Sequence, residues 1–203
     1  MSTPPPLVDD LAAAGVEVSD LWELVNARTA NYPEAVPVLL DWLEHVDERV
    51  AEADRRRLRD GLIRALTVPS ARPQAAPLMI HLFKRADDPT GFGERWVIGN
   101  ALGVVADDSY VDELAALASD RRYGKGRQML VLGLARFRDP RIVPLLIDLL
   151  DDDDVVGHAA EALGRLKAVE ARPALEPLLA DERPVVRREA KKALAKIGHA
   201  AQR

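Results

Sequence analysis

Cysteine is absent from the 203 residues of this chain. Its absence excludes disulfides, thiolate nucleophiles, thiolate zinc sites and iron–sulfur clusters. Aromatic residues make up only 4% of the chain, although hydrophobic residues make up 48%. This composition argues against a β-sandwich or β-barrel, whose strands favour aromatic and β-branched residues. It suits helices that pack closely through alanine and leucine.

Long apolar runs are also missing: none approaches the ~18 residues that a membrane-spanning helix needs. The first ten residues, MSTPPPLVDD, contain neither a basic nor an apolar segment, so no secretory signal is visible. We therefore expect a cytoplasmic protein without a membrane partner. The net charge of −5 argues against nucleic-acid binding, because phosphate contacts require clustered lysine and arginine.

A leucine followed by a small residue recurs along the C-terminal half of the chain. The pairs are Leu102-Gly103, Leu134-Ala135, Leu163-Gly164 and Leu194-Ala195. They are separated by 32, 29 and 31 residues, which indicates a tandem repeat of roughly thirty residues. The small residue would allow a neighbouring helix to approach closely.

Each repeat predicts two helices joined by a polar turn. Apolar residues at helical spacing, such as Leu130 and Leu134, mark the first helix. A turn containing Asp139 and Pro140 suits a helix start. The second helices share a proline near their start, replaced by Asp112 in the middle repeat: Pro37, Pro77, Pro144 and Pro173. Their predicted core residues are Ile142, Leu146, Leu149 and Leu150; Tyr110, Leu114, Leu117 and Ala118; and Ala171, Leu175, Leu178 and Leu179.

These elements resemble the HEAT-like repeat family, in the short form known from bilin lyases. The resemblance covers residues 18–198 and is most regular over 92–198. It implies an all-α fold, an α-solenoid in which antiparallel helix pairs build a right-handed superhelix. We expect a tail or cap at 1–17, one solenoid of about five helix pairs plus a capping helix at 18–198, and a tail at 199–203. Armadillo or another helical array is the alternative architecture.

The repeat register separates core from surface on the second helices. In the HEAT-like arrangement these helices line the concave face, where a partner commonly binds. We predict that five residues off the core stripe bind the partner: Asp41, His81, Glu113, Leu145 and Asp148. Their mixture of acidic and apolar side chains suits a protein partner, particularly a basic one. The alternative is a solvated helix face.

The segment RRYGKGR brings together four cations without an acid: Arg121, Arg122, Lys125 and Arg127. It precedes a first helix, so its cations and the free N–H groups of that helix would suit a phosphate or an acidic side chain. The segment is not a Walker loop, because it lacks the required framing and Ser/Thr. The alternative is a linker whose basic side chains balance nearby aspartates: Asp107, Asp108 and Asp120.

Three further features have a structural interpretation. Residues 151–154 are consecutive aspartates that lack the spacing of a calcium loop, so we interpret them as a solvated turn capping the next helix. The net basic segment 183–196 is expected to shield the end of the helix stack. Trp42 occupies a core position, whereas Trp96 matches polar or small residues in the other repeats. Trp96 therefore either packs under the linker at 87–93 or is partly exposed as a contact anchor.

A catalytic constellation is not evident. The histidines lack the following glutamate that HEAT-like deoxyhypusine hydroxylases use to hold iron, and the predicted groove lacks the basic character of HEAT-like DNA glycosylases. His81 and Asp41 would form an acid–base pair if they met on adjacent repeats, but we favour a solvated surface or a partner contact for these two residues. We expect no metal and no cofactor.

The sequence thus predicts a non-catalytic scaffold or adaptor that binds a partner protein on its concave face. The alternative is an enzyme-accessory or lyase-like factor that holds a small ligand in the groove. Bilin-lyase activity is implied only by the style of the repeats, and repeat style does not determine chemistry.

Overall fold

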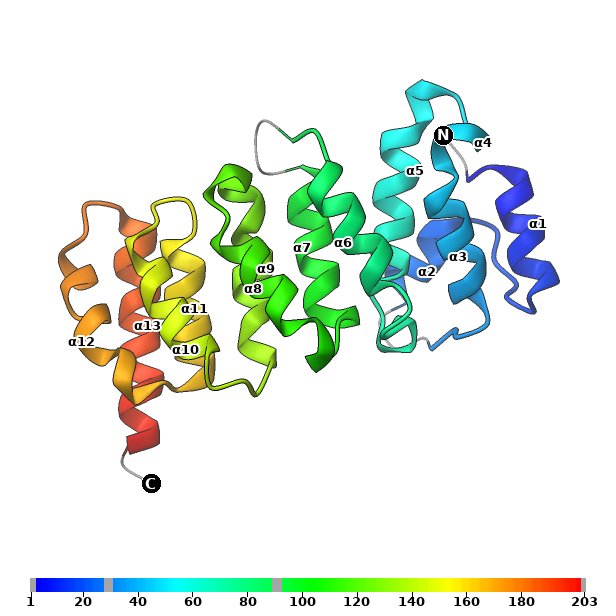
Figure 1. The fold of residues 1–203 in the computed structure, drawn as a ribbon. Helices are drawn as coiled ribbons and strands as arrows, with labels where there is room; N and C mark the ends of the chain where they lie inside the picture. The colour runs from blue at the N-terminus through cyan, green and yellow to red at the C-terminus, as the bar shows by residue number, and fades with distance from the viewer. Residues whose placement is uncertain (1–2, 28–30, 89–92, 202–203) are drawn as a thin grey trace. The chain divides into compact units, whose positions relative to one another are not determined.

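The computed structural model describes residues 3–27, 31–88 and 93–201, in which every regular element is a helix (Figure 1). The predicted all-α class is therefore confirmed. The α-helices are α1 (Pro5–Ala13), α2 (Leu21–Asn26), α3 (Ala35–Glu44), α4 (Val46–Arg49), α5 (Glu52–Ala65), α6 (Ala76–Arg85), α7 (Glu94–Val105), α8 (Val111–Ser119), α9 (Gln128–Gly133), α10 (Ile142–Asp148), α11 (Val156–Leu166), α12 (Arg172–Leu175) and α13 (Pro184–Ala201). The 3₁₀ helices are η1 (Pro69–Ala71), η2 (Asp108–Tyr110), η3 (Arg121–Arg127), η4 (Leu134–Arg136), η5 (Leu149–Asp151), η6 (Val169–Ala171) and η7 (Pro177–Ala180).

The helices follow the predicted alternation of first and second helices. The first helices are α2, α5, α7, α9 and α11, and the second helices are α3, α6, α8, α10 and α12, with α13 as the last helix. The segment predicted as a tail or cap contains α1, whose Leu7 and Leu11 are fully buried. At the other end α13 continues to Ala201, beyond the predicted boundary at residue 198.

Two compact units make up the chain. Unit 1 contains Met1–Ala86 and Asn100–Ala106, and unit 2 contains Asp87–Gly99 and Asp107–Arg203. The chain passes between the units at three points, and one of them, from Gly99 to Asn100, falls within α7. The arrangement of residues 18–198 as a single solenoid stays a prediction.

The core of unit 1 forms where α1 packs on α3, and where α2, α3 and α4 pack on α5. Trp42 is only 4% exposed, so its predicted core position is confirmed. Its indole Nε1 donates a hydrogen bond to Asp10 at 2.8 Å, which connects α3 to α1. The hydroxyl of Tyr32 donates to the carbonyl of Ala65 at 2.8 Å, which fixes the chain before α3 to the end of α5.

The core of unit 2 centres on α11, which packs against α9, α10 and α13. Gly164 shows how closely α11 and α13 approach, since a Cβ atom there would lie 2.7 Å from the Cα atom of Ala193. The small residue after the repeated leucine therefore permits the helix contact that the sequence predicted. On the second helix of the same repeat, Ala171 and Leu175 are fully buried.

Leu179 departs from the predicted core pattern, because its side chain is 46% exposed. Pro177 explains the difference. Pro177 has no backbone N–H to donate to the carbonyl four residues earlier, so the α-helical hydrogen bonding of α12 ends at Leu175 and the chain continues as η7. A 3₁₀ helix has about 3.0 residues per turn instead of about 3.6. The later leucines are consequently rotated out of the expected register.

Candidate functional site

The predicted binding residues of unit 1, Asp41 on α3 and His81 on α6, are both exposed. Asp41 does not pair with His81. Its carboxylate instead contacts Arg49 at 2.7 Å and lies 3.3 Å from the ring Nδ1 of His45. Arg49 also stacks over the ring of Trp42, 4.8 Å from its centroid. Asp41 is thus an exposed carboxylate held by His45, which follows α3, and by Arg49 of α4, and the less favoured acid–base pair with His81 is not formed.

The predicted binding residues of unit 2 are less uniform in exposure. Asp148 on α10 is exposed, whereas Leu145 on the same helix and Glu113 on α8 are half-buried. Ile142 and Leu146, which also lie on α10, are buried in the core. The repeat register therefore assigned the two faces of α10 correctly. Asp148 is the member of this set that presents its charge most openly.

The basic segment divides into exposed and buried cations. Arg121, Arg122 and Lys125 are exposed on η3. The guanidinium of Arg122 forms a salt bridge with the carboxylate of Asp120, and the shortest distance between their atoms is 2.6 Å. This hydrogen bonding lowers the pKa of Asp120 and raises that of Arg122. The pairing is the one expected for a linker that neutralises a neighbouring aspartate.

Arg127 corrects the anion-binding expectation, because its side chain is fully buried. Its guanidinium donates to Asp152 at 2.9 Å, to the carbonyl of Ala118 at 2.9 Å and to the carbonyl of Gly124 at 3.0 Å. Asp152 is likewise only 4% exposed. The two residues form a buried ion pair that connects successive repeats, so Arg127 is a structural residue with no surface for a ligand.

Asp152 also corrects the interpretation of residues 151–154 as a wholly solvated turn. Its second carboxylate oxygen accepts from the backbone N–H of Asp154 at 3.1 Å. Asp152 therefore stabilises the turn from a buried position and pairs with a cation, whereas the expected side-chain cap of the next helix, α11, is not formed.

The same aspartate turn recurs between helices. The carboxylate accepts from the backbone N–H two residues later in each case: Asp20, Asp107, Asp120, Asp139, Asp152 and Asp181. An arginine at the second position adds side-chain hydrogen bonds, as in Arg141 and Arg183. These bonds hold the pKa of Asp139 and of Asp181 at about 2. Six of the 33 acidic residues therefore stabilise turns, and three of these turns are visible in the sequence as Asp-x-Arg: Asp120, Asp139 and Asp181.

Trp96 lies in the first turns of α7 and is half-buried. The neighbouring Arg95 guanidinium lies 5.0 Å from the ring centroid of Tyr123. Part of the linker expected to cover Trp96, residues 89–92, lies outside the described residues. The role of Trp96 as a contact anchor remains a prediction.

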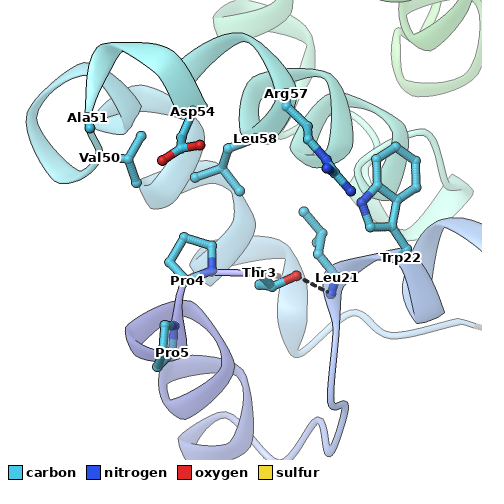
Figure 2. Close-up of a pocket in the computed structure, with 10 residues that line it drawn as sticks. All are labelled: Thr3, Pro4, Pro5, Leu21, Trp22, Val50, Ala51, Asp54, Arg57 and Leu58. Carbon is cyan, nitrogen blue, oxygen red and sulfur yellow. Dashed lines mark hydrogen bonds between the residues drawn. The ribbon is translucent and has the colours of Figure 1, made fainter. Parts of the chain in front are cut away.

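A pocket of about 390 Å³ opens in unit 1 (Figure 2). It is lined by residues 3–5, by Leu21 and Trp22 of α2, by Val50 and Ala51, and by Asp54, Arg57 and Leu58 of α5. None of these residues belongs to α3 or α6, so the pocket is separate from the predicted binding residues of unit 1. Sequence reasoning missed it because its walls come from three distant segments.

Across residues 3–27, 31–88 and 93–201, no three histidine, aspartate or glutamate side chains are grouped to hold a metal ion. Within the same ranges no helix combines the length and apolar character needed to cross a bilayer.

Comparison with known families identifies the repeats. Residues 111–195, from α8 to α13, match the family model of HEAT repeats. The predicted HEAT-like family is thus confirmed by the part of the chain in which the leucine–small-residue motif is most regular. No match was found among curated proteins.

Proposed function

We propose that this HEAT-repeat protein is a non-catalytic scaffold or adaptor that binds a partner protein through its second helices. The observation that carries the proposal is the exposure of Asp148 on α10, opposite the buried Ile142 and Leu146. HEAT repeats commonly present such helices as an extended binding surface.

The partner is proposed to be basic at its contact surface. Asp148 and Asp41 are exposed, and Glu113 adds a half-buried carboxylate on α8. Leu145 supplies an apolar contact beside Asp148 on the same helix. Opposite charge at an interface accelerates association and selects partners, while the apolar contact contributes affinity.

Asp148→Lys is the sharpest test, because no ion pair of Asp148 would be broken by the change. In a quantitative affinity capture from source cells, we expect the variant to lose a specific partner that the wild-type protein retains. Glu170→Lys is the matched control, since Glu170 is an exposed acid on η6 outside the proposed surface. Both variants should keep the helical circular dichroism of the wild type.

Asp41→Lys is a second, less isolated test, because it also removes the contact with Arg49. Arg49→Gln removes that contact while it leaves the Asp41 carboxylate in place. Loss of the partner by Asp41→Lys but not by Arg49→Gln would assign the effect to the acidic surface. If Asp148→Lys and Glu170→Lys retain every captured protein equally, the proposed surface is wrong.

A further inference from the structure

The pocket of unit 1 contains a carboxylate whose hydrogen bonding is incomplete. The Oδ1 atom of Asp54 is buried from solvent and has no hydrogen-bond partner. Burial of a carboxylate oxygen without a donor is unfavourable, and buried polar groups in folded proteins are normally paired. Figure 2 shows the Asp54 side chain reaching from α5 into the pocket between Val50 and Leu58. The unpaired oxygen is closed to solvent, so a ligand in the pocket would meet Asp54 as a negatively charged lining residue.

The cation of the pocket lies toward its other end. Arg57 follows Asp54 by three residues on α5, but its side chain extends toward α2 (Figure 2). Its charge also contributes to lowering the pKa of Asp20, the residue that caps α2. Asp20 itself is occupied, since its carboxylate accepts from the backbone of Trp22 at 2.8 Å and of Thr3 at 3.4 Å. A ligand would therefore find a negative group at one end and a positive group at the other.

The wall between the two charges is apolar and firmly held. Leu58 lies between Asp54 and Arg57, Pro4 and Leu21 line the opposite side of the pocket, and Trp22 adds an aromatic surface (Figure 2). The rim formed by residues 3–5 is fixed to α2, because the Thr3 hydroxyl oxygen accepts from the backbone N–H of Leu21 at 2.8 Å. A volume of about 390 Å³ is within the range of small-ligand sites.

We propose that this pocket binds a zwitterion of dipeptide size, with its ammonium group at Asp54, its carboxylate at Arg57 and an apolar stem between them. The Asp54 carboxylate lines the pocket, so its negative charge would attract the ammonium group. The Arg57 guanidinium presents a planar fork that matches a carboxylate. None of the residues assigned to protein binding lines the pocket, so the proposal is independent of the scaffold function.

Isothermal titration calorimetry of the full chain tests the proposal with leucyl-leucine and its blocked forms. We expect leucyl-leucine to bind, and either N-acetylation or C-terminal amidation to weaken binding by about tenfold or more, since each removes a charged hydrogen bond. Binding of the doubly blocked peptide with the affinity of leucyl-leucine would overturn the proposal, because the pocket would then accept an internal chain segment. Absence of leucyl-leucine binding would also overturn it.

Two substitutions assign the ends of the ligand. Asp54→Asn should weaken the binding of leucyl-leucine by about tenfold but leave the binding of the N-acetylated peptide unchanged. Arg57→Gln should likewise weaken the binding of leucyl-leucine but leave the binding of the amidated peptide unchanged. Glu52→Gln and Arg56→Gln are matched controls, since both residues are exposed on α5 but do not line the pocket. Melting temperatures and helical circular dichroism verify folding of all four variants. Equal weakening by Asp54→Asn and Glu52→Gln would refute the assigned role of Asp54.

Discussion

Replacement of Arg127 by methionine should destabilise unit 2 strongly, although the residue belongs to a segment rich in surface cations. The side chain is fully buried and donates to one carboxylate and two backbone carbonyls. Removal of one partner from a buried ion pair costs about 3–5 kcal/mol, because the other charge is left without compensation. We use methionine because it retains much of the apolar stem and thus limits the cavity.

The surroundings of Asp152 place the expected loss at the lower end of that range, about 3 kcal/mol. Arg121 approaches the same carboxylate at 3.5 Å, and the backbone N–H of Asp154 donates to its other oxygen. Arg121 compensates only partly, since its side chain is 66% exposed and screened by water. Asp152→Leu should cost more, about 5 kcal/mol, because it leaves the Arg127 guanidinium buried with carbonyl partners alone.

Urea unfolding followed by far-ultraviolet circular dichroism measures these losses. Arg122→Met is the matched control: Arg122 also pairs with an aspartate, but its side chain is 84% exposed, and a surface pair contributes about 0–1 kcal/mol. The double variant Arg127→Met/Asp152→Leu should lose at least about 2 kcal/mol less than the sum of the single losses. A loss below about 1 kcal/mol for Arg127→Met, or additive losses in the double variant, would refute the assigned role of the pair.

Two other predictions concern helix packing and acid stability. Gly164→Ala should destabilise the protein by about 1–3 kcal/mol, since its Cβ would meet the backbone of α13. Gly198→Ala, in open space on that helix, should stabilise it by about 0.5–1 kcal/mol; equal thermal-unfolding shifts would contradict the packing argument. Arg183 holds the pKa of Asp181 at about 2, below its ordinary value of 3.8. The ion pair of Asp181 with Arg183 stabilises the fold above the unfolded-state pKa of Asp181, and this stabilisation should disappear as the pH falls from about 4 to about 2. Arg183→Gln should therefore reduce the fall in melting temperature between about pH 4 and about pH 2. If the melting temperature of the variant depends on pH as in the wild type, the Asp181–Arg183 ion pair does not cause that fall.

The repeats were predictable because their packing problem recurs in the sequence. The repeated leucines Leu102, Leu134 and Leu163 are fully buried, so the spacing of hydrophobic residues in the sequence correctly predicted core positions of the fold. The exposure of Asp148 followed from the same register. The register failed at Leu179, where a proline changed the helix type and thus the angle between successive side chains.

The candidate sites were less predictable because they depend on contacts between distant segments. Arg127 has the same side chain as Arg121 and Arg122, and only the packing of Asp152 against it separates a buried cation from exposed ones. The pocket arises where residues 3–5 meet α2 and α5. Residues 3–5 belong to the segment that was expected to form a tail or cap, and neither a tail nor a cap predicts that these residues line a ligand pocket.

The aspartate turns between the helices have a consequence for the order of folding. Each carboxylate binds a backbone N–H only two residues away, so turn formation requires no contact from another repeat. Structures dominated by such local contacts have low contact order and fold rapidly. Because helical repeats are stabilised by their neighbours, a pair of helices held by one of these turns would serve as a starting point for the next pair. Folding is therefore expected to begin at several positions along the chain and to spread between adjacent repeats.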